Sequence, residues 1–551
     1  MSVEIEQHSN GELLITISAK GDILSEQQAL ELIFKTEDAL AQLLKQPDSA
    51  PTAAKQSSTE SSTPVVEAPQ VNGYNGDFDW TPEALEIRRT VANLTGLKEP
   101  EVSENTSIFE LGLDSIEAIK LSARLRRSGV QVSVSIIMRN PTIRKLNAYL
   151  QKVSIQPQKA SDNTSLLDFE AQARKQFPEK CFEAIYPATP LQEAMIVETL
   201  TSNYKFYFNH DVLEIDNNVD LERLHNAWKM VIQENPILRT SFFQVHELGI
   251  VSPHAFGQVV HKKIEIPWTE ISLSLGDNVW QELQEAMDYC TSTADLLQRP
   301  PLQLTVVKGG KSRYLLLSIS HALYDGWSIS LLHEDIRRAY YNSLVSRPSP
   351  ASLLENILKN NREESSRFWK QLLQGAEISE FPSQYDDQKT HKNKLISKTG
   401  YATAAAFCKR LGVTVQTLGQ TCWGLVLAHC LGRSDLLFGT VLSGRDTDNA
   451  EEIMFPSMNT VPVRAIVHGS YRTMLQYMQD NSGNVLKHQH TPLRMIQKLV
   501  STSGKRLFDT LFIYQRGQAD SEVQRLYQSI QGSSDIEVSR ISVNAWHMYY
   551  S

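Results

Sequence analysis

The chain has 551 residues, of which 41% are hydrophobic and 21% are charged, and its formal net charge is −9 at pH 7. Since one domain usually takes about 100–200 residues, this length predicts several folding units with ample apolar residues for their cores. The mildly acidic balance gives no support to a nucleic-acid partner or to binding at an anionic membrane.

The cysteines and the N-terminus indicate a cytoplasmic protein without a metal site. The five cysteines are scattered along the chain and form no close pairs with nearby histidines of the kind that zinc requires. Free thiols are typical of the reducing cytosol. The first residues, MSVEIEQHSN, lack the basic and apolar regions of a signal peptide, and no run approaches the roughly 18 apolar residues of a membrane span.

The N-terminal segment predicts two strands and a helix. Residues 3–18 alternate as two short strands around the turn HSNG. A helix is expected from about Ser25 to Leu44, with Ser25 as its N-cap and apolar residues such as Leu32 and Leu40 on one face. The segment is too short to cover that face, so we interpret it as the end of a larger domain or as a docking piece.

A polar linker and a small helical region come next. Residues 48–77 are rich in Pro, Ser, Thr and Ala, a composition that buries too little apolar surface to fold. Residues 78–152 show helical spacing after a Thr81–Pro82 helix entry and again from Ile116 to Gly129. This pattern predicts a bundle of three or four helices.

The rest of the chain predicts a mixed α/β region, which a second polar linker at residues 153–174 precedes. Strands are expected at 314–320 and 435–444. Helices are expected at 221–234 and 406–432.

The stretch ELGLDSIEAIK places Ser115 where a loop with Gly112 turns into a helix. The commonest use of such a serine is as an N-cap. However, Leu111, Gly112, Asp114, Ser115 and Ile116 together resemble the attachment motif of acyl and peptidyl carrier proteins. The resemblance implies that a phosphopantetheinyl transferase attaches 4′-phosphopantetheine to Ser115, where a helix N-terminus favours a phosphodiester.

A second motif, SHALYDGWS at residues 320–328, follows an apolar strand and precedes a helix. By itself it fits a histidine at a strand end and an aspartate that caps the helix. Five further segments, together with this one, resemble in sequence and order the core motifs of nonribosomal peptide synthetase condensation domains. These segments are YPATPLQEAMI (186–196), NPILRTSF (235–242), MFPSMNTVPVR (454–464), HQHTPLRMI (488–496) and RLFDTLFIYQ (506–515).

The resemblance implies a multidomain fold, in which an all-α four-helix carrier bundle precedes an α/β condensation domain of two chloramphenicol-acetyltransferase-like lobes. The lobes are expected at residues 175–345 and 346–551. His321 matches the second histidine of the family motif, which implies that it accepts a proton from the amine or hydroxyl that attacks a thioester. Asp325 is expected to be structural and to pair with Arg239, or else with Arg445.

Two further residues of the condensation motifs are candidate site residues. Gly326 is expected to leave room for a carrier arm and to offer a backbone N–H to a developing oxyanion. Asn459 matches the family asparagine near the site. Substrates and partners are then acyl or peptidyl thioesters and other modules or carrier domains of a synthetase.

Ser320 stands where the family motif has its first histidine, and a serine cannot replace imidazole as a base. Serine at this position resembles the terminal condensation domains of fungal synthetases, which release or cyclise the product. The motif as a whole resembles hydroxamate siderophore synthetases of the ferrichrome and fusarinine kind. The implied function is the formation of an amide or ester bond. The implied place of this reaction is the terminal step of siderophore biosynthesis, in which the product is released or cyclised.

The first and last parts of the predicted domain order each have more than one interpretation. Residues 1–47 resemble the final segment of a condensation domain and are interpreted as a remnant of an upstream one, while the C-terminal lobe is interpreted as truncated. Alternatively, residues 3–47 complete that lobe within the same chain, which predicts that they pack on it. Two alternatives to a condensation enzyme also remain: an epimerase-like domain, and a noncatalytic docking or carrier-recruiting fragment.

Overall fold

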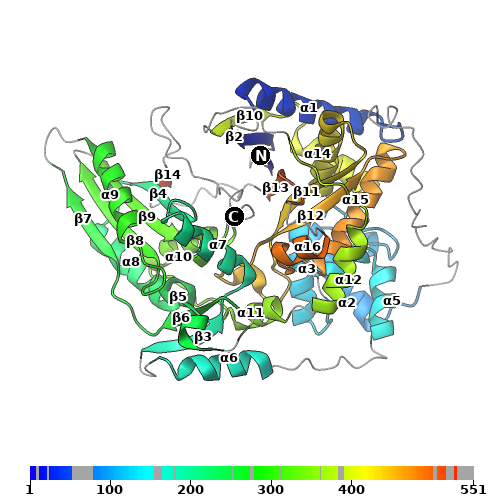
Figure 1. Cartoon of the computed structure of the whole chain (residues 1–551). Coiled ribbons are helices and arrows are strands. Elements are labelled where there is room, and N and C mark those ends of the chain that lie inside the picture. The colour runs from blue at the N-terminus through cyan, green and yellow to red at the C-terminus, as the bar shows by residue number, and fades with distance from the viewer. Residues whose placement is uncertain are drawn as a thin grey trace. The chain divides into compact units, whose positions relative to one another are not determined.

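A computed structural model describes the protein in two compact units (Figure 1). The described residues are 1–7, 11–20, 24–51, 78–113, 115–132, 134–153, 164–177, 181–250, 252, 254–273, 278–309, 312–359, 362–381, 390–500, 506–516 and 527–529. The first unit takes in residues 1–159, 360–451 and 459–520, and the second takes in 160–359, 452–458 and 521–551.

Two sheets form the second unit. The five-stranded sheet has the order β14-β4-β9-β8-β7, and the three-stranded sheet has the order β3-β6-β5. The strands are β3 (Phe182–Pro187), β4 (Phe208–Ile215), β5 (Thr240–Gln244), β6 (Phe256–His261), β7 (Trp268–Ser272), β8 (Leu302–Gly309), β9 (Ser312–Ser320) and β14 (Tyr527–Ser529). The helices are α6 (Thr164–Arg174), α7 (Pro190–Thr201), α8 (Leu221–Glu234), α9 (Val279–Thr293), α10 (Ser328–Tyr340) and α11 (Ala351–Leu358).

The central strand β9 is buried on both faces, because Leu315, Leu316 and Leu317 are all fully buried. A continuous apolar run of this kind is what a strand inside a covered sheet requires. Helix α8 packs against α10 and turns Trp228 into the main core of the unit. Its bounds are those expected from the sequence.

The helical bundle expected at residues 78–152 has four helices in the structure: α2 (Pro82–Thr95), α3 (Ser115–Arg127), α4 (Val134–Arg139) and α5 (Ile143–Val153). Thr81 caps α2 by accepting a hydrogen bond from the backbone N–H of Ala84, and Pro82 takes the first helical position. Gly96, with φ +71°, ends the helix in the left-handed region. The buried core of the bundle includes Ile87, Leu121 and Leu146.

The rest of the first unit, here called the C-terminal lobe, is a six-stranded sheet with helices packed on it. The strand order is β10-β2-β1-β13-β11-β12. The strands are β1 (Ser2–Gln7), β2 (Leu13–Lys20), β10 (Thr390–Ile396), β11 (Asp435–Leu442), β12 (Asn459–Ile466) and β13 (Leu511–Arg516). The helices are α1 (Glu26–Lys45), α12 (Arg362–Leu372), α13 (Tyr401–Leu411), α14 (Val415–Leu431), α15 (Tyr471–Leu486) and α16 (Leu493–Val500).

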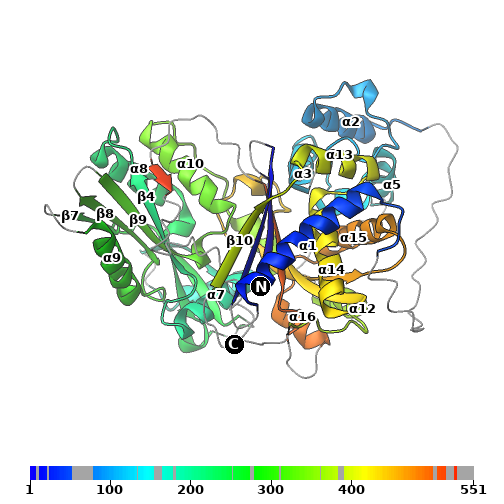
Figure 2. The same ribbon diagram turned by 90° about the horizontal axis from the view of Figure 1, so that it is seen from above.

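The N-terminal segment lies inside this sheet. Strand β1 pairs in parallel with β13, with Val3 opposite Phe512, and β2 pairs antiparallel with β10. Helix α1, capped by Ser25, lies beside α14 (Figure 2). This is the packing expected if the segment completes the lobe within the same chain, whereas its origin in an upstream domain stays a prediction.

The single helix expected at residues 406–432 is wrong: the structure has two helices, α13 and α14. Gly412, with φ +66°, ends α13 in the left-handed region, and Thr414 then caps α14 by accepting a hydrogen bond from Thr417 N–H. The boundary between the two units also differs from the expected lobe boundary at 345/346. It falls after Lys359, and residues 452–458 join the second unit, where Ile453 and Phe455 are buried in its core.

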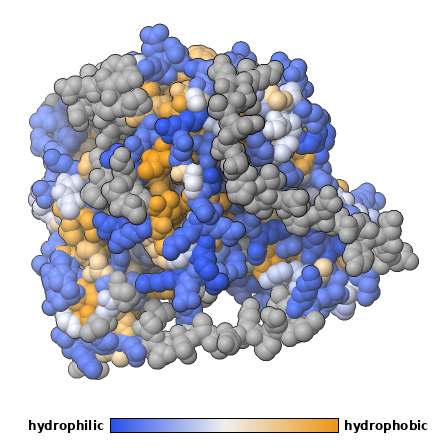
Figure 3. Space-filling view, turned by 45° about the vertical axis from the view of Figure 1, so that its right-hand side comes forward, coloured by the Kyte–Doolittle hydropathy of each residue, from blue (hydrophilic) through white to orange (hydrophobic). Residues whose placement is uncertain are grey.

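The described surface in Figure 3 is mostly hydrophilic, with smaller hydrophobic areas between the charged ones. Within the described residues, no helix combines the length and apolar character that crossing a bilayer requires. The same residues contain no cluster of His, Cys, Asp or Glu that could hold a metal ion.

Candidate active site and carrier attachment site

The motif SHALYDGWS lies at the end of β9 in the second unit. Ser320 is the last residue of β9, where it pairs with Phe208 of β4, and a 3₁₀ turn, η5 (His321–Leu323), follows. The Ser320 hydroxyl accepts a hydrogen bond from Ala322 N–H at 3.3 Å and caps this turn. Ser320, His321 and Asp325 are all buried.

His321 is held on both sides of its ring. Its Nδ1 lies 2.9 Å from the carbonyl oxygen of Tyr324, and the Tyr324 ring stacks on the imidazole with centroids 4.6 Å apart. The Tyr207 ring meets the imidazole edge to face at 6.2 Å, and the His321 backbone N–H donates to the Tyr207 carbonyl at 2.7 Å. These contacts fix the orientation of the ring.

The same contacts set the protonation of His321. A carbonyl oxygen only accepts, so Nδ1 must carry the proton and Nε2 must hold the free lone pair. Burial lowers the pKa of His321 below its ordinary value, although hydrogen bonds and the nearby Asp325 act in the opposite direction. At neutral pH the side chain is therefore a neutral imidazole whose Nε2 can accept a proton.

The Asp325 carboxylate accepts hydrogen bonds from backbone N–H groups. Its Oδ1 accepts hydrogen bonds from Trp327 N–H at 3.1 Å and Ser328 N–H at 2.7 Å, which start α10. Its Oδ2 accepts from Ser457 N–H at 2.9 Å and Met458 N–H at 3.4 Å. A carboxylate with these four donors is a structural tie between the motif and residues 452–458.

Two arginines were the candidate partners of Asp325. Arg239 has other partners, since it forms an ion pair with Glu183 at 3.1 Å and donates to the carbonyls of Ile232 and His261. The expected Asp325–Arg239 pair is thus corrected to Glu183–Arg239. Arg445 is buried and its Nη1 donates to the Ala450 carbonyl at 2.6 Å, and its pairing with Asp325 stays a prediction.

Gly326 and Asn459 have distinct surroundings. A Cβ placed on Gly326 would meet nothing within 4 Å, so the space beside this residue is open. Asn459 belongs to the first unit, where its Nδ2 donates to the carbonyls of Gln489 and Thr491 at 2.7 and 2.9 Å. The catalytic contributions expected of both residues stay predictions.

Several residues around His321 were missed by the sequence reasoning. Gln192, fully buried at the start of α7, donates from Nε2 to the Ala322 carbonyl at 3.1 Å and so supports the turn that carries His321. It stands inside the quoted motif YPATPLQEAMI, which could have indicated it. Tyr324 was also inside a quoted motif, but Tyr207 had no signal because only the pairing of β4 with β9 brings it to His321.

The predicted attachment site lies at the start of α3 in the first unit. Helix α3 begins at Ser115, and Gly112, with φ +97°, sits in the turn before it. Asp114 and the Ser115 side chain lie outside the described residues. A serine at the first position of a helix of 13 residues fits a phosphodiester group, because the free backbone N–H groups point toward that end.

Two family models match the chain. The family model for the condensation domain matches residues 182–550, and the model for the phosphopantetheine attachment site matches residues 86–150. The solved condensation domain of the monacolin K polyketide synthase MokA is 15% identical, with 61% of this chain and 83% of that chain covered and a TM-score of 0.49.

Curated relatives come from fungi. Nonribosomal peptide synthetase sidC of Arthroderma benhamiae is 40% identical over 98% of this chain and 11% of its own length. Nonribosomal peptide synthetase Ao415 of Arthrobotrys oligospora is 36% identical over 98% of this chain and 16% of its own length. The chain therefore spans a small part of these relatives. It belongs to the condensation-domain family, and a phosphopantetheine-binding carrier domain precedes its condensation domain.

Proposed function

We propose that the protein forms an amide or ester bond from an acyl or peptidyl thioester, with His321 as the general base. The observation that carries the proposal is the fixed neutral imidazole: Nδ1 is held by the Tyr324 carbonyl and Nε2 keeps its lone pair. A base of this kind can take the proton from an attacking amine or hydroxyl, which is worth about 10²–10⁴ in rate.

We assign the other residues supporting roles. Asp325 holds the loop through four backbone donors, and Gln192 supports the turn of His321, so both act on the position of the imidazole. Ser320 caps the turn and supplies no base. The open space beside Gly326 is compatible with the approach of a substrate arm.

We place the attachment of 4′-phosphopantetheine at Ser115, because the matched attachment domain contains this serine at the start of α3. When bound, this group supplies a thiol that holds the acyl chain as a thioester. A phosphopantetheinyl transferase and other carrier domains or modules of a synthetase are the proposed partners, in the cytoplasm. The serine at position 320 and the likeness to the fungal relatives support a terminal release or cyclisation step in siderophore synthesis.

Loading tests the carrier assignment. The 551-residue chain is incubated with a phosphopantetheinyl transferase and an acyl-coenzyme A, and its intact mass is measured. The wild type and Ser103→Ala, which alters an exposed serine of the same bundle, should gain the mass of one acyl-phosphopantetheine. Ser115→Ala should gain none; uptake by that variant would remove Ser115 from the proposal.

Turnover tests the assignment of His321. The loaded protein is supplied with an amine or hydroxyl acceptor, and the product is followed by mass spectrometry. His321→Ala should lose about 10²–10⁴ in rate, whereas His246→Ala, which changes an exposed histidine of the same unit, should keep the wild-type rate. Equal turnover in His321→Ala and wild type would exclude the general-base role, and absence of turnover in all variants would favour a noncatalytic fragment.

A further inference from the structure

Strand β4 brings a polar side chain to the residue that holds the imidazole of His321. The strand pairs antiparallel with β9 and places Asn209 opposite Ile319, two residues before His321. From this position the Asn209 amide donates from Nδ2 to the hydroxyl of Tyr324 at 2.6 Å. A residue that lies 112 positions before His321 in the sequence thus contacts the side chain that covers its ring.

Tyr324 contacts the imidazole in two ways. Its carbonyl oxygen accepts from Nδ1 of His321 at 2.9 Å, and its ring stacks on the imidazole with centroids 4.6 Å apart and planes 10° apart. The chain holds the Tyr324 ring at its Cα, and the hydrogen bond from Asn209 holds it at the opposite end. A ring fixed at both ends loses the freedom to turn away from its neighbour.

We propose that Asn209 is a positioning residue for the reaction: by holding the Tyr324 hydroxyl, it keeps the Tyr324 ring on the imidazole and so fixes the direction of the Nε2 lone pair of His321. The proposal rests on the general-base role proposed above for His321. When Nε2 takes the proton of the attacking amine or hydroxyl, the imidazole becomes a cation, and the face of an aromatic ring attracts a cation. The stacked ring therefore favours the charged form of His321 that the reaction produces.

The backbone that leads into β4 has an unusual conformation beside His321. Asn203, Tyr204 and Tyr207 have φ values of +51°, +62° and +60°, in a region that residues with bulky side chains rarely adopt. Tyr207 is buried, and its carbonyl accepts from His321 N–H at 2.7 Å. Strained backbone persists only where the surrounding structure holds it, and it gathers at functional sites. The entry into β4 is thus shaped around His321, and Asn209 follows it by two residues.

Asn209 acts on a different part of the loop from Gln192. Gln192 donates to the Ala322 carbonyl at 3.1 Å and so fixes the backbone of the turn. Asn209 contacts the Tyr324 hydroxyl and so fixes a ring. Loss of Asn209 should therefore free the ring over His321 while the turn keeps its backbone contacts.

A double-mutant cycle on the 551-residue chain tests the proposal. Asn209→Leu removes the donor at similar volume, Tyr324→Phe removes the acceptor and keeps the ring, and the double variant lacks both. In turnover with an amine or hydroxyl acceptor, each single variant should lose about 3- to 10-fold in kcat, as expected for one hydrogen bond, with KM for the acceptor unchanged. The double variant should lose no more than either single variant, because both changes remove the same contact.

Asn217→Leu is the matched control, since Asn217 is an exposed asparagine just after β4 and its variant should keep the wild-type rate. Asn209→Leu and Tyr324→Phe remove opposite ends of one hydrogen bond, so a folding defect in one of them would show as a difference between the two. Losses that multiply in the double variant, or a wild-type kcat in Asn209→Leu, would overturn the proposal.

The tautomer of His321 gives a readout that needs no turnover. The protein is labelled with ¹⁵N in histidine only, and the His321 signals are those that disappear in His321→Ala. In the wild type they should show the proton on Nδ1, whereas Asn209→Leu and Tyr324→Phe should show both tautomers in exchange. Signals in Asn209→Leu identical to those of the wild type would reduce the hydrogen bond to packing and overturn the proposal.

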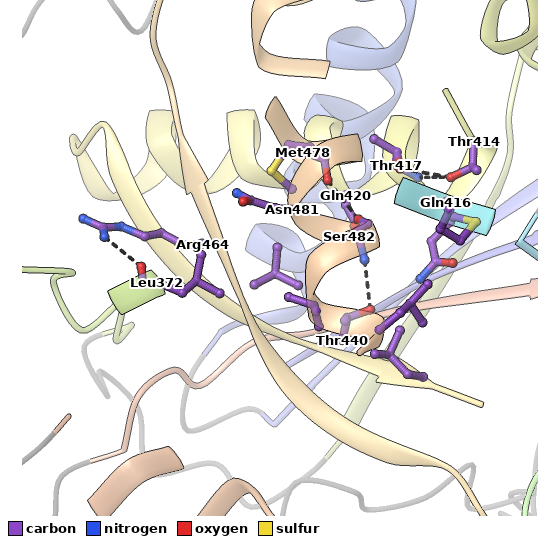
Figure 4. Close-up of a pocket in the computed structure, with 15 residues that line it drawn as sticks. Leu372, Thr414, Gln416, Thr417, Gln420, Thr440, Arg464, Met478, Asn481 and Ser482 are labelled. Carbon is purple, nitrogen blue, oxygen red and sulfur yellow. Dashed lines mark hydrogen bonds between the residues drawn. The ribbon is translucent and has the colours of Figure 1, made fainter. Parts of the chain in front are cut away.

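Gln420→Leu is the control for the loss of an amide–hydroxyl hydrogen bond elsewhere in the chain. The Gln420 amide donates to the Thr440 hydroxyl at 3.0 Å in the C-terminal lobe, beside a cavity of about 40 Å³ that α14 and α15 help to line (Figure 4). This variant should leave the His321 signals unchanged. A change equal to that of Asn209→Leu would show a general loosening of the protein and overturn the specific role of Asn209.

The positioning role and the general-base role can fail separately. If His321→Ala turned over like the wild type, the general-base role would fail, and the tautomer of His321 would still report whether Asn209 holds the ring. If His321 is required for turnover while Asn209→Leu keeps both the wild-type rate and the wild-type tautomer, only the positioning role fails.

Discussion

The N-terminal hairpin should be required for the stability of the C-terminal lobe. Strands β1 and β2 lie between β10 and β13, so they are the interior of the six-stranded sheet. Ile15 and Ile17 of β2 are fully buried there. Ile17→Ala removes three carbon groups worth about 0.8 kcal/mol each in transfer free energy, and the cavity left behind adds to this, which gives a loss of about 2–4 kcal/mol.

Hydrogen exchange measured by mass spectrometry separates this lobe from the second unit. Ile17→Ala should raise exchange in peptides from β10 and β13 and leave peptides from β8 and β9 unchanged, since local stability is read segment by segment. Phe34→Ala is the control on the same N-terminal segment, because Phe34 is 55% exposed and its loss should change stability by less than about 0.5 kcal/mol.

Deletion of residues 2–51 is the severer form of this perturbation. It removes both strands that lie between β10 and β13, and also the Ser49 carbonyl that accepts from Tyr471 N–H and the Asp48 carboxylate paired with Arg472 at 2.6 Å. We expect the lobe to lose its cooperative unfolding transition, because a folded domain is stable by only about 5–15 kcal/mol. An unchanged melting profile and unchanged exchange in β13 would refute the place of the hairpin in the sheet.

Three further predictions concern the second unit. The turnover rate should stay constant as pH falls from 7 to about 6.5, and decline only below it, because burial lowers the pKa of His321 and the neutral form is the base; a decline centred at or above the ordinary value would contradict this. Asp325→Ala should destabilise the unit by about 2–4 kcal/mol in urea unfolding, since it strands buried backbone donors, and Asp325→Asn should cost less. Burial lowers the pKa of His210 to about 4 in the folded state, below its ordinary value of 6.5. On acidification the unfolded state therefore binds a proton before the folded state does, and the free energy of unfolding falls between about pH 6.5 and 4. His210→Gln should make the melting temperature depend less on pH over that range.

Local sequence patterns predicted those elements whose signals are local. Helix α8 has the expected bounds because Asp220 caps it and its apolar residues occupy one face. The division between α13 and α14 was missed for an equally physical reason. Most residues of α14 are buried, so its apolar residues show no one-sided period, and the apolar residues on both sides of Gly412 were interpreted as one helix although Gly412 and Thr414 are residues typical of a helix end and a helix start.

The partners of the site residues depend on sheet register, which no local pattern contains. The pairing of β3 with β6 sets Phe182 opposite His261, and this brings Glu183 beside the carbonyl that Arg239 also contacts. A long guanidinium side chain can reach any of several acids, so the register, and not the spacing along the chain, selects Glu183 over Asp325. Asp325 instead satisfies backbone donors on both sides of its loop, a demand that arises only once residues 452–458 lie against that loop. His321 itself could be identified from its own motif, because that signal is local. The residues that hold its ring could be identified only from the fold.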